Sequence, residues 1–317
     1  MIARRALAAL ALLTLVAGAS QAARQPGPVT VVTALQPLYS IATALAQGTA
    51  ITVKPVPATL PGMGQVTRIL ARANRTTDQT LEAADVVVAI ASIWPEDPLF
   101  REARARNIWV VEIDAARPLG KGQASVALIA KPVTDVPWRE AETGGGDSPY
   151  VWFSPANAIR MAEIVATDFK RLAPDGAAAI ETNLAAFTRE FLGLKAEYEA
   201  KFLKVADPRV LSLTDRFAYL TNEAGVFVDG YFLEDDVRWT DADYAGFTRL
   251  LREREITRVL HHWEPSEGIM AAIAAAGAKL VILNDGETEP APGAPDPRGY
   301  QTMLRANLET LHRGFAD

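Results

Sequence analysis

The most informative stretch of this 317-residue chain is Ser148-Pro149-Tyr150-Val151-Trp152-Phe153-Ser154-Pro155-Ala156-Asn157-Ala158. Its second proline, Pro155, stands where a helix can begin, and residues 156–172 continue as an amphipathic helical pattern. A longer helical pattern follows over residues 177–205, with apolar side chains three and four positions apart. At roughly 1.5 Å per residue this second helix is about 40 Å long, which is enough to run along two lobes.

Short apolar runs alternate with helical patterns on both sides of this stretch. Strands are expected at residues 29–33, 50–56, 83–89 and 108–113, and again at residues 210–213, 226–228, 258–261 and 280–283. The alternation is typical of βαβ units and parallel sheets. We therefore predict an α/β fold with two lobes, each a mainly parallel sheet flanked by helices, bridged by one long rigid helix. A ligand would then lie in the cleft between the lobes, at the carboxyl ends of strands.

The N-terminus has the pattern of a secretory signal peptide. Arg4 and Arg5 precede an apolar run that is too short to span a bilayer of about 30 Å, and Ser20-Gln21-Ala22 offers small residues for cleavage. We expect a periplasmic protein, with secretion beyond the outer membrane as the alternative. The predicted divisions are a signal peptide (1–22), an N-terminal lobe (29–175), a bridging helix (176–205) and a C-terminal lobe (206–317). Between the strands of the first lobe and the quoted stretch, residues 115–146 are rich in proline and glycine and are expected to form a long surface loop.

Composition excludes several classes of function. The chain has no cysteine, so disulfides, thiolate metal sites and cysteine nucleophiles are ruled out. Its net charge is −6, and removal of the two signal-peptide arginines makes it −8; with no stripe of Lys and Arg, nucleic acid is not an expected partner. No nucleophile elbow, HExxH, P-loop or GxGxxG motif is present, so an enzyme is not expected.

The quoted stretch resembles the Asp-Pro-His-Val-Trp-Leu-Asp-Pro-x-Asn-Ala signature of the zinc/manganese-type (cluster A-I) solute-binding proteins of bacterial metal ABC importers. Other parts of the chain are similar to the same family in the same order, namely 31–39, 81–88, 183–187, 215–219 and 305–308. Residues 215–219 resemble the family's His-Asp-Ala-Phe-Gly-Tyr turn. The resemblance implies two α/β lobes bridged by a rigid helix, four side chains that hold zinc, manganese or iron in the cleft, and delivery to a membrane permease.

The resemblance also implies that the family's metal ligands are replaced in this chain. The first family His falls in the turn 60–65, near Met63; the second is Tyr150; the third, a His or Glu, is Thr214. The fourth ligand, an Asp, falls at Asn284, with Asp285 beside it. We therefore predict a rebuilt site of Tyr150, Asp215, His262 and Asp285. Phenolate and carboxylate are hard ligands, which favour Fe(III), or Mn(II) without the phenolate, over zinc.

Alternatives for these residues stay open on sequence alone. Asp215 can simply orient its own turn, and Asp285-Gly286 reads as an ordinary turn. His262 can reach the cleft, but we favour a strand-end pair in which one of His261 and His262 is hydrogen-bonded and the other is exposed. Five aromatic residues could line the cleft, but most of them are expected in the core: Trp94, Tyr150, Trp152, Trp239 and Trp263.

Three functions follow from this pattern. The chain can be a monomeric solute-binding protein of a metal importer with an altered metal site. It can instead bind a metal chelate or a small organic solute. It can also be an accessory protein of the importer that binds no solute.

Overall fold

The computed structural model describes residues 27–72, 74–140, 142–286 and 295–316, so the predicted signal peptide lies outside the described residues. Two four-stranded parallel sheets form the centres of two lobes, in the orders β2-β1-β3-β4 and β6-β5-β7-β8. Their strands are β1 (Val29–Thr33), β2 (Ile51–Pro55), β3 (Val86–Ala89), β4 (Val111–Asp114), β5 (Arg209–Ser212), β6 (Phe227–Tyr231), β7 (Arg258–His261) and β8 (Lys279–Ile282). The predicted α/β class and parallel sheets are confirmed.

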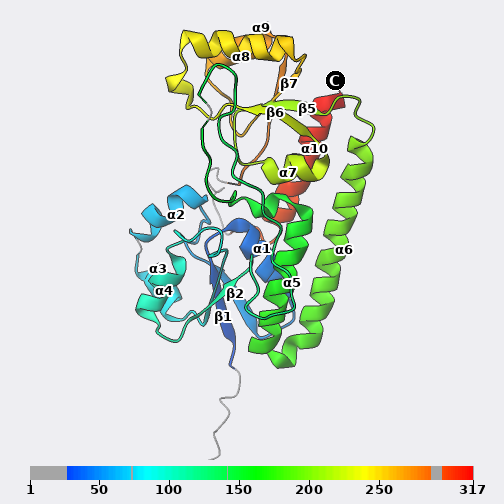
Figure 1. Cartoon of the computed structure of the whole chain (residues 1–317). Helices are drawn as coiled ribbons and strands as arrows, with labels where there is room; N and C mark the ends of the chain where they lie inside the picture. Colours follow the sequence, from blue (N-terminus) through cyan, green and yellow to red (C-terminus); the bar gives the residue numbers. More distant parts are fainter. Residues whose placement is uncertain (1–26, 73, 141, 287–294, 317) are drawn as a thin grey trace, which may run out of the picture.

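Helices flank both sheets, and one helix joins the lobes. The α-helices are α1 (Gln36–Ala46), α2 (Met63–Leu70), α3 (Arg75–Glu82), α4 (Leu99–Arg106), α5 (Pro155–Leu172), α6 (Ala177–Phe202), α7 (Ala218–Ala224), α8 (Asp241–Glu253), α9 (Glu267–Ala275) and α10 (Gly299–Ala316). Short 3-10 turns are η1 (Val151–Phe153), η2 (Pro174–Gly176) and η3 (Asp236–Arg238). Figure 1 shows α6 running beside both lobes, with α8 and α9 on the far side of the second sheet. No helix among the described residues is long and apolar enough to cross a bilayer.

Local sequence explains where the central elements begin. β3 is a run of Val86, Val87, Val88 and Ala89, and all four side chains are buried, as expected of a strand covered on both faces. Helix α5 begins at Pro155 after Ser154, whose Oγ accepts a hydrogen bond from the backbone N–H of Asn157 at 3.1 Å. The quoted motif therefore forms the turn η1 and the capped start of α5.

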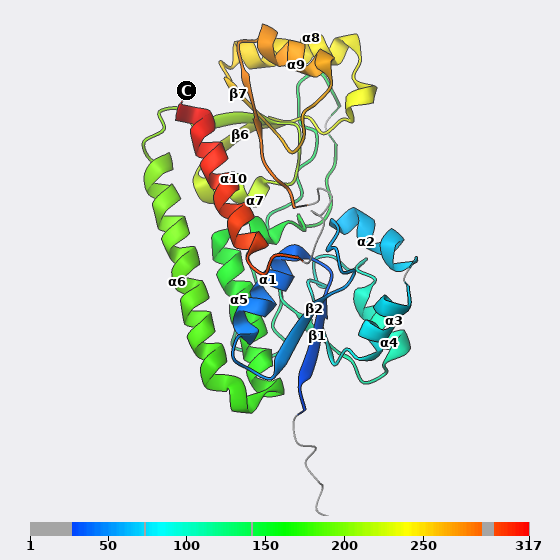
Figure 2. The ribbon, with the colours of Figure 1, turned by 180° about the vertical axis from the view of Figure 1, so that it is seen from behind.

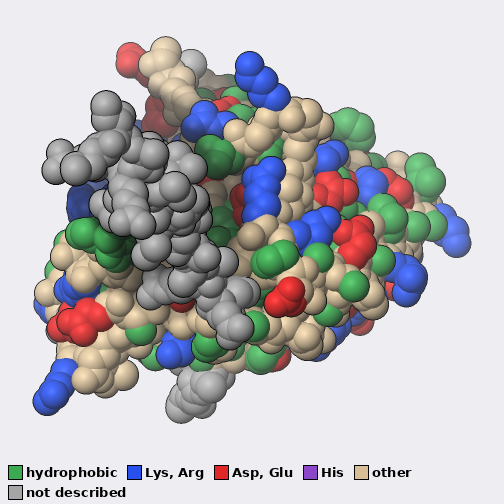
Figure 3. Space-filling view, turned by 90° about the horizontal axis from the view of Figure 1, so that it is seen from below, with side chains coloured by type: hydrophobic (Ala, Val, Ile, Leu, Met, Phe, Trp, Pro, Cys, Tyr) green, Lys and Arg blue, Asp and Glu red, His purple; other side chains and the backbone are tan. Residues whose placement is uncertain are grey.

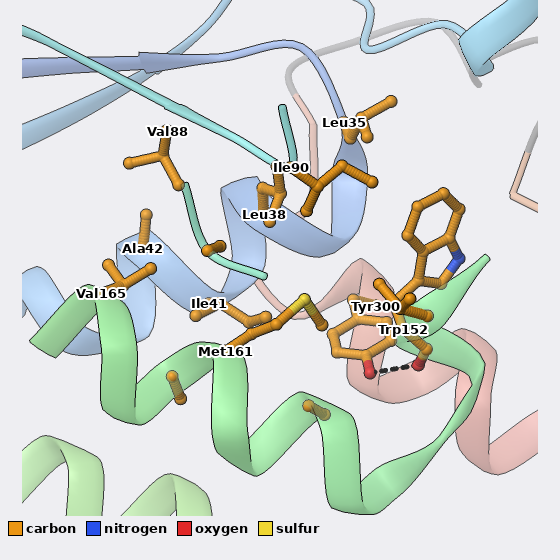
Figure 4. Packing of buried hydrophobic residues seen from close by; sticks show 14 of the residues in the cluster. Leu35, Leu38, Ile41, Ala42, Val88, Ile90, Trp152, Met161, Val165 and Tyr300 are labelled. Carbon is orange, nitrogen blue, oxygen red and sulfur yellow. Dashed lines mark hydrogen bonds between the residues drawn. The ribbon is translucent and has the colours of Figure 1, made fainter. Parts of the chain in front are cut away.

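The main hydrophobic core crosses the predicted division between the lobes. It contains residues of the first lobe and α6 together with Tyr300, Leu304 and Leu308 of α10. Seen from behind in Figure 2, α10 runs from the second lobe down to α1. In the close view of Figure 4, Trp152 and Tyr300 pack together, and the Tyr300 hydroxyl donates to the Trp152 carbonyl at 2.5 Å. The C-terminal helix thus packs against the first lobe as well as the second, while the boundaries 29–175, 176–205 and 206–317 remain predictions.

The segment between β4 and η1 differs from the surface loop that we expected for residues 115–146. It is irregular, as its proline and glycine content indicates, but part of it is buried against the second lobe. The N–H of Asp135 donates to the Tyr231 carbonyl at 3.0 Å, Val136 joins the second core, and Trp138 packs edge-on against Phe232. Composition indicates the absence of regular structure, but it does not show whether apolar side chains within the segment are covered.

Seen from below, the described surface has mixed charge. Figure 3 shows Lys and Arg side chains interspersed with Asp and Glu over this face. Charges of both signs in alternation are typical of a solvated surface rather than of a nucleic-acid interface.

Candidate metal centre

Four side chains from distant parts of the chain meet where the two lobes join. Tyr150 immediately precedes η1, Arg216 follows β5, His262 follows β7 and Asp285 follows β8. Three of them therefore stand just beyond the carboxyl ends of neighbouring parallel strands, where ligand sites of α/β sheets lie. We call Tyr150, Arg216, His262 and Asp285 the junction site.

An ion pair lies at the centre of the junction site. Arg216 Nη1 is 2.8 Å from Asp285 Oδ2, and the two side chains are 20% and 3% exposed. The Arg216 guanidinium also lies over the Tyr150 ring, with its central carbon 5.4 Å from the ring centroid. A carboxylate as deeply buried as Asp285 is stabilised by such a charge-assisted contact.

Tyr150, in the position of a family His, is held by its aromatic neighbours. Its ring packs edge-on against Trp152 at 5.6 Å between centroids and lies 6.4 Å from Phe153. Because Trp152 and Phe153 are buried in the core, they fix the ring at the border between core and junction.

His261 is buried and the side chain of His262 is almost fully covered, so the expectation that one of them is exposed is wrong. His261 is 2% exposed, and the His262 side chain is 9% exposed. Among the described residues, both ring nitrogens of His262 and Nδ1 of His261 have no hydrogen-bond partner. Alternation along a strand predicts that the two side chains lie on opposite faces. The Trp263 ring packs against both, with its centroid 4.5 Å from that of His261 and 3.9 Å from that of His262, and so helps to cover them.

The two imidazoles are neutral at neutral pH. Burial, with smaller effects of Arg216 and His261, lowers the pKa of His262 to about 3. Burial likewise lowers the pKa of His261 to about 4. His262 Nε2 lies 3.8 Å from Asp285 Oδ2, and because the ring is uncharged this contact is not an ion pair. A neutral imidazole beside a carboxylate is the protonation state that metal coordination requires.

Asp215, the fourth residue of the predicted site, lies apart from the other three. Its carboxylate is 3.7 Å from Lys131 Nζ, in the segment that packs on the second lobe. Neighbouring residues of a tight turn point in different directions, and here Arg216 rather than Asp215 reaches Asp285. Of the predicted set, the structure therefore brings His262 and Asp285 together, links Tyr150 to Asp285 through Arg216, and places Asp215 beside Lys131.

The other family ligand positions are occupied by residues with local roles. Met63 is the first residue of α2 and belongs to the main core. Thr214 is buried, and its Oγ1 accepts a hydrogen bond from the N–H of Arg216 at 3.4 Å. Asn284 is exposed, and its Oδ1 accepts from the N–H of Gly286 at 2.8 Å. The acidic side chain that faces the junction is thus Asp285, one position beyond the family's Asp.

Of the four tryptophans that could line the cleft, three pack in the cores, as expected. Trp94 and Trp152 are buried, and Trp239 packs against Phe232 and Phe247 in the second core. Trp263 is exposed and contacts both histidines.

No ready-made cluster of metal ligands marks the junction among the described residues. Within residues 27–286 and 295–316, apart from positions 73 and 141, no group of three His, Cys, Asp or Glu side chains is placed to hold a metal ion. A groove of about 870 Å³ lies elsewhere, between α8 and α9, and is lined by Tyr244, Arg252 and Ala272 among others. The junction differs from this groove in its buried polar side chains, since Asp285 and the His262 ring are almost fully covered.

Arg216 is the junction residue that our sequence reasoning missed. The family turn His-Asp-Ala-Phe-Gly-Tyr has an Ala at its third position, where this chain has Arg216. Replacement of a small residue by a long cationic one, next to a lost ligand, was visible in the sequence and could have identified it.

Sequence and structure comparisons agree on one family. The model of the family described as "Zinc-uptake complex component A periplasmic" (ZnuA) matches residues 31–314. The zinc-binding lipoprotein AdcA of Streptococcus pneumoniae is 22% identical over 237 residues, which are 70% of this chain and 46% of that protein. The chain thus spans about half the length of the curated relatives it matches.

Solved structures share the fold at low identity. A mutant of FpvC from Pseudomonas aeruginosa superposes with a TM-score of 0.71 at 21% identity, covering 91% of this chain and 99% of that one. FpvC in complex with Mn2+ gives 0.68 at 19% identity over the same shares. Zn(II)-bound AdcA from S. pneumoniae gives 0.67 at 18% identity, covering 92% and 58%. Because the family model covers most of its length, the chain belongs to the periplasmic zinc-uptake component A family, a family of solute-binding proteins and not of enzymes.

Proposed function

We propose that this chain is the periplasmic solute-binding component of a metal ABC importer, and that it captures its metal ion at the junction site. The observation that supports this best is the approach of His262 to Asp285 beyond the strand ends of a family fold, with Tyr150 beside them across Arg216. Relatives whose structures contain Mn2+ or Zn(II) have the same fold. Delivery of the ion would follow when both lobes dock on the permease.

The three side chains have suitable chemistry for a transition metal. His262 offers a neutral imidazole with both ring nitrogens buried, Asp285 a carboxylate and Tyr150 a phenol oxygen. Two oxygen ligands with one nitrogen favour Fe(III), or Mn(II) if the phenol stays protonated, over the nitrogen-rich sites that suit zinc. Affinity for zinc should therefore be lower than that of a site with three histidines.

Calorimetric titration of the mature, chelator-stripped protein tests this proposal. Zn(II) and Mn(II) are titrated as chlorides and Fe(III) as its citrate. We expect one ion to bind with a stoichiometry of one. Removal of each ligand should weaken binding by more than about 10-fold, because loss of a residue that only hydrogen-bonds to a metal ligand already costs that much. The variants are His262→Gln, Asp285→Asn and Tyr150→Phe.

A matched control separates the junction from histidine content in general. His312 packs edge-on against Phe202 at the C-terminal end of α10, and His312→Gln should leave the affinity unchanged. Tight zinc binding that persists in a His261→Gln/His262→Gln double variant would show that the ligand assignment is wrong.

A metal chelate or small organic solute is a second candidate, favoured by one observation. The Arg216–Asp285 ion pair places a cation among imidazole and aromatic groups, a lining that suits an anionic complex better than a bare ion. Retention of isotope-labelled citrate together with Fe(III) on the protein would select this candidate, because capture of the bare ion would leave the citrate in solution. A protein that takes up neither would instead be an accessory component of the importer.

A further inference from the structure

Arg216 pairs with the same oxygen of Asp285 that His262 approaches. Its Nη1 is 2.8 Å from Asp285 Oδ2, whereas a transition metal bound to a carboxylate oxygen lies about 2.0–2.2 Å away. Both cannot use the same lone pair of Oδ2 at once. The guanidinium also covers the face of Tyr150, so it lies between two of the three proposed ligands.

The turn after β5 holds Arg216 in this position. The N–H of Arg216 donates to Thr214 Oγ1 at 3.4 Å, and Ser212 Oγ donates to the Thr214 carbonyl at 2.7 Å. The next residue, Phe217, is buried and packs edge-on against Phe153 of η1. The backbone is therefore anchored on both sides of Arg216, so a change of rotamer of its long side chain would not require the turn to move.

We propose that the Arg216 guanidinium competes with the metal ion for the Asp285 carboxylate. The metal ion then binds only when the Arg216 side chain changes rotamer and leaves Asp285. This inference rests on the proposed function, since it takes Asp285 as a metal ligand. It makes Arg216 a specificity-determining residue: an ion that binds oxygen ligands weakly does not displace it, whereas a highly charged ion that binds them strongly does. The family's Ala at this position has no side chain that could act in this way.

The variant Arg216→Gln tests the competition directly. Glutamine keeps a polar side chain of moderate length but removes the charge. We expect its Kd for MnCl2 and ZnCl2 to fall by about 10- to 100-fold, which corresponds to the net contribution of one hydrogen bond between charged groups. In the Arg216→Gln/Asp285→Asn double variant this gain should disappear. Arg216→Lys, which retains a cation, should keep most of the competition.

Lys131→Gln is the matched control. Lys131 is a cation in the irregular segment that packs on the second lobe, and it pairs with Asp215, the neighbour of Arg216. Its loss should change the Kd less than twofold, which distinguishes a specific competitor from a general effect of net charge. Thermal unfolding without metal shows whether each variant folds, and the increase in melting temperature with 1 mM MnCl2 provides a second readout that should be larger in Arg216→Gln than in the wild type.

The outcomes separate this inference from the proposed function. If the wild type binds metal through Asp285 and Arg216→Gln binds no more tightly, the competition is refuted and the proposed function stands. If only Arg216→Gln binds metal, the competition is supported and a bare ion is not the solute of the wild type. If neither protein binds metal, both ideas are refuted.

Discussion

The attachment of the irregular segment to the second lobe gives a quantitative prediction. Asp243 of α8 is 1% exposed. It accepts hydrogen bonds from Trp138 Nε1 at 3.1 Å, from Arg139 at 2.9 and 2.8 Å, and from the backbone and side chain of Thr240 at 2.8 and 2.6 Å. The same carboxylate therefore completes the capping box of α8 and fixes the segment.

The pKa of Asp243 sets the size of the effect. Burial raises this pKa, but the hydrogen bonds from Arg139, Thr240 and Trp138 outweigh burial and lower it from 3.8 to about 2. The difference corresponds to about 2 kcal/mol of folding stability at pH 7. Arg139 is 36% exposed, so water screens part of this contribution. We expect Asp243→Asn to lower the free energy of unfolding by between about 1 and 2 kcal/mol.

The dependence on pH follows from the sign of the shift. Because the folded pKa is lowered, the stabilisation is complete above the unfolded pKa of 3.8 and is lost as the pH falls through about 2. Urea unfolding followed by tryptophan fluorescence should show the full difference between wild type and Asp243→Asn at pH 7. Near pH 3 about half of that difference should remain.

Asp241→Asn provides the control, since Asp241 is an exposed acid in the first turn of the same helix. It should change the stability by no more than about 0.5 kcal/mol. Equal effects of the two variants, or a cost of Asp243→Asn that is the same at pH 7 and pH 3, would refute the reasoning.

Three further predictions concern the junction and the frame around it. His262→Phe should abolish metal binding. It should leave the free energy of unfolding unchanged or raise it by up to about 2 kcal/mol, because it removes two buried ring nitrogens that lack partners among the described residues. A large loss of stability in chemical unfolding would instead indicate a structural role for His262. Gly246→Ala should destabilise the protein by about 1–3 kcal/mol, since the added Cβ would lie 2.4 Å from the Trp138 ring; an unchanged urea midpoint would contradict this packing. The 26-residue helix α6 should limit closure to a small tilt, so small-angle scattering should show nearly the same radius of gyration with and without ligand, and a large compaction would contradict a stiff bridge.

Most of the fold could be predicted from the sequence because its periodic signals are strong and local. Val86-Val87-Val88 and the other apolar runs gave the strands, and proline and Thr240 marked helix starts, with the Thr240 cap confirmed. The burial of the segment around Val136 and Trp138 could not be predicted, because it depends on contacts with residues about 100 positions away.

The candidate site was less predictable, and the reason is geometric. Motif positions identify Tyr150 and the strand ends that carry His262 and Asp285. Which side chain of a turn faces the junction depends on backbone dihedrals that spacing does not encode. Asp215 therefore entered the predicted set although it faces Lys131, and Arg216 was left out although it pairs with Asp285.

The central claim is that a metal ion is captured at the junction through Tyr150 and Asp285. Its most direct test is elemental mass spectrometry on the mature protein purified from the periplasm without a metal-affinity tag, beside a Tyr150→Phe/Asp285→Asn variant prepared in the same way. The account predicts one transition metal per wild-type molecule and almost none in the variant. A metal content that is equal in both proteins, or no metal in the wild type, would contradict it.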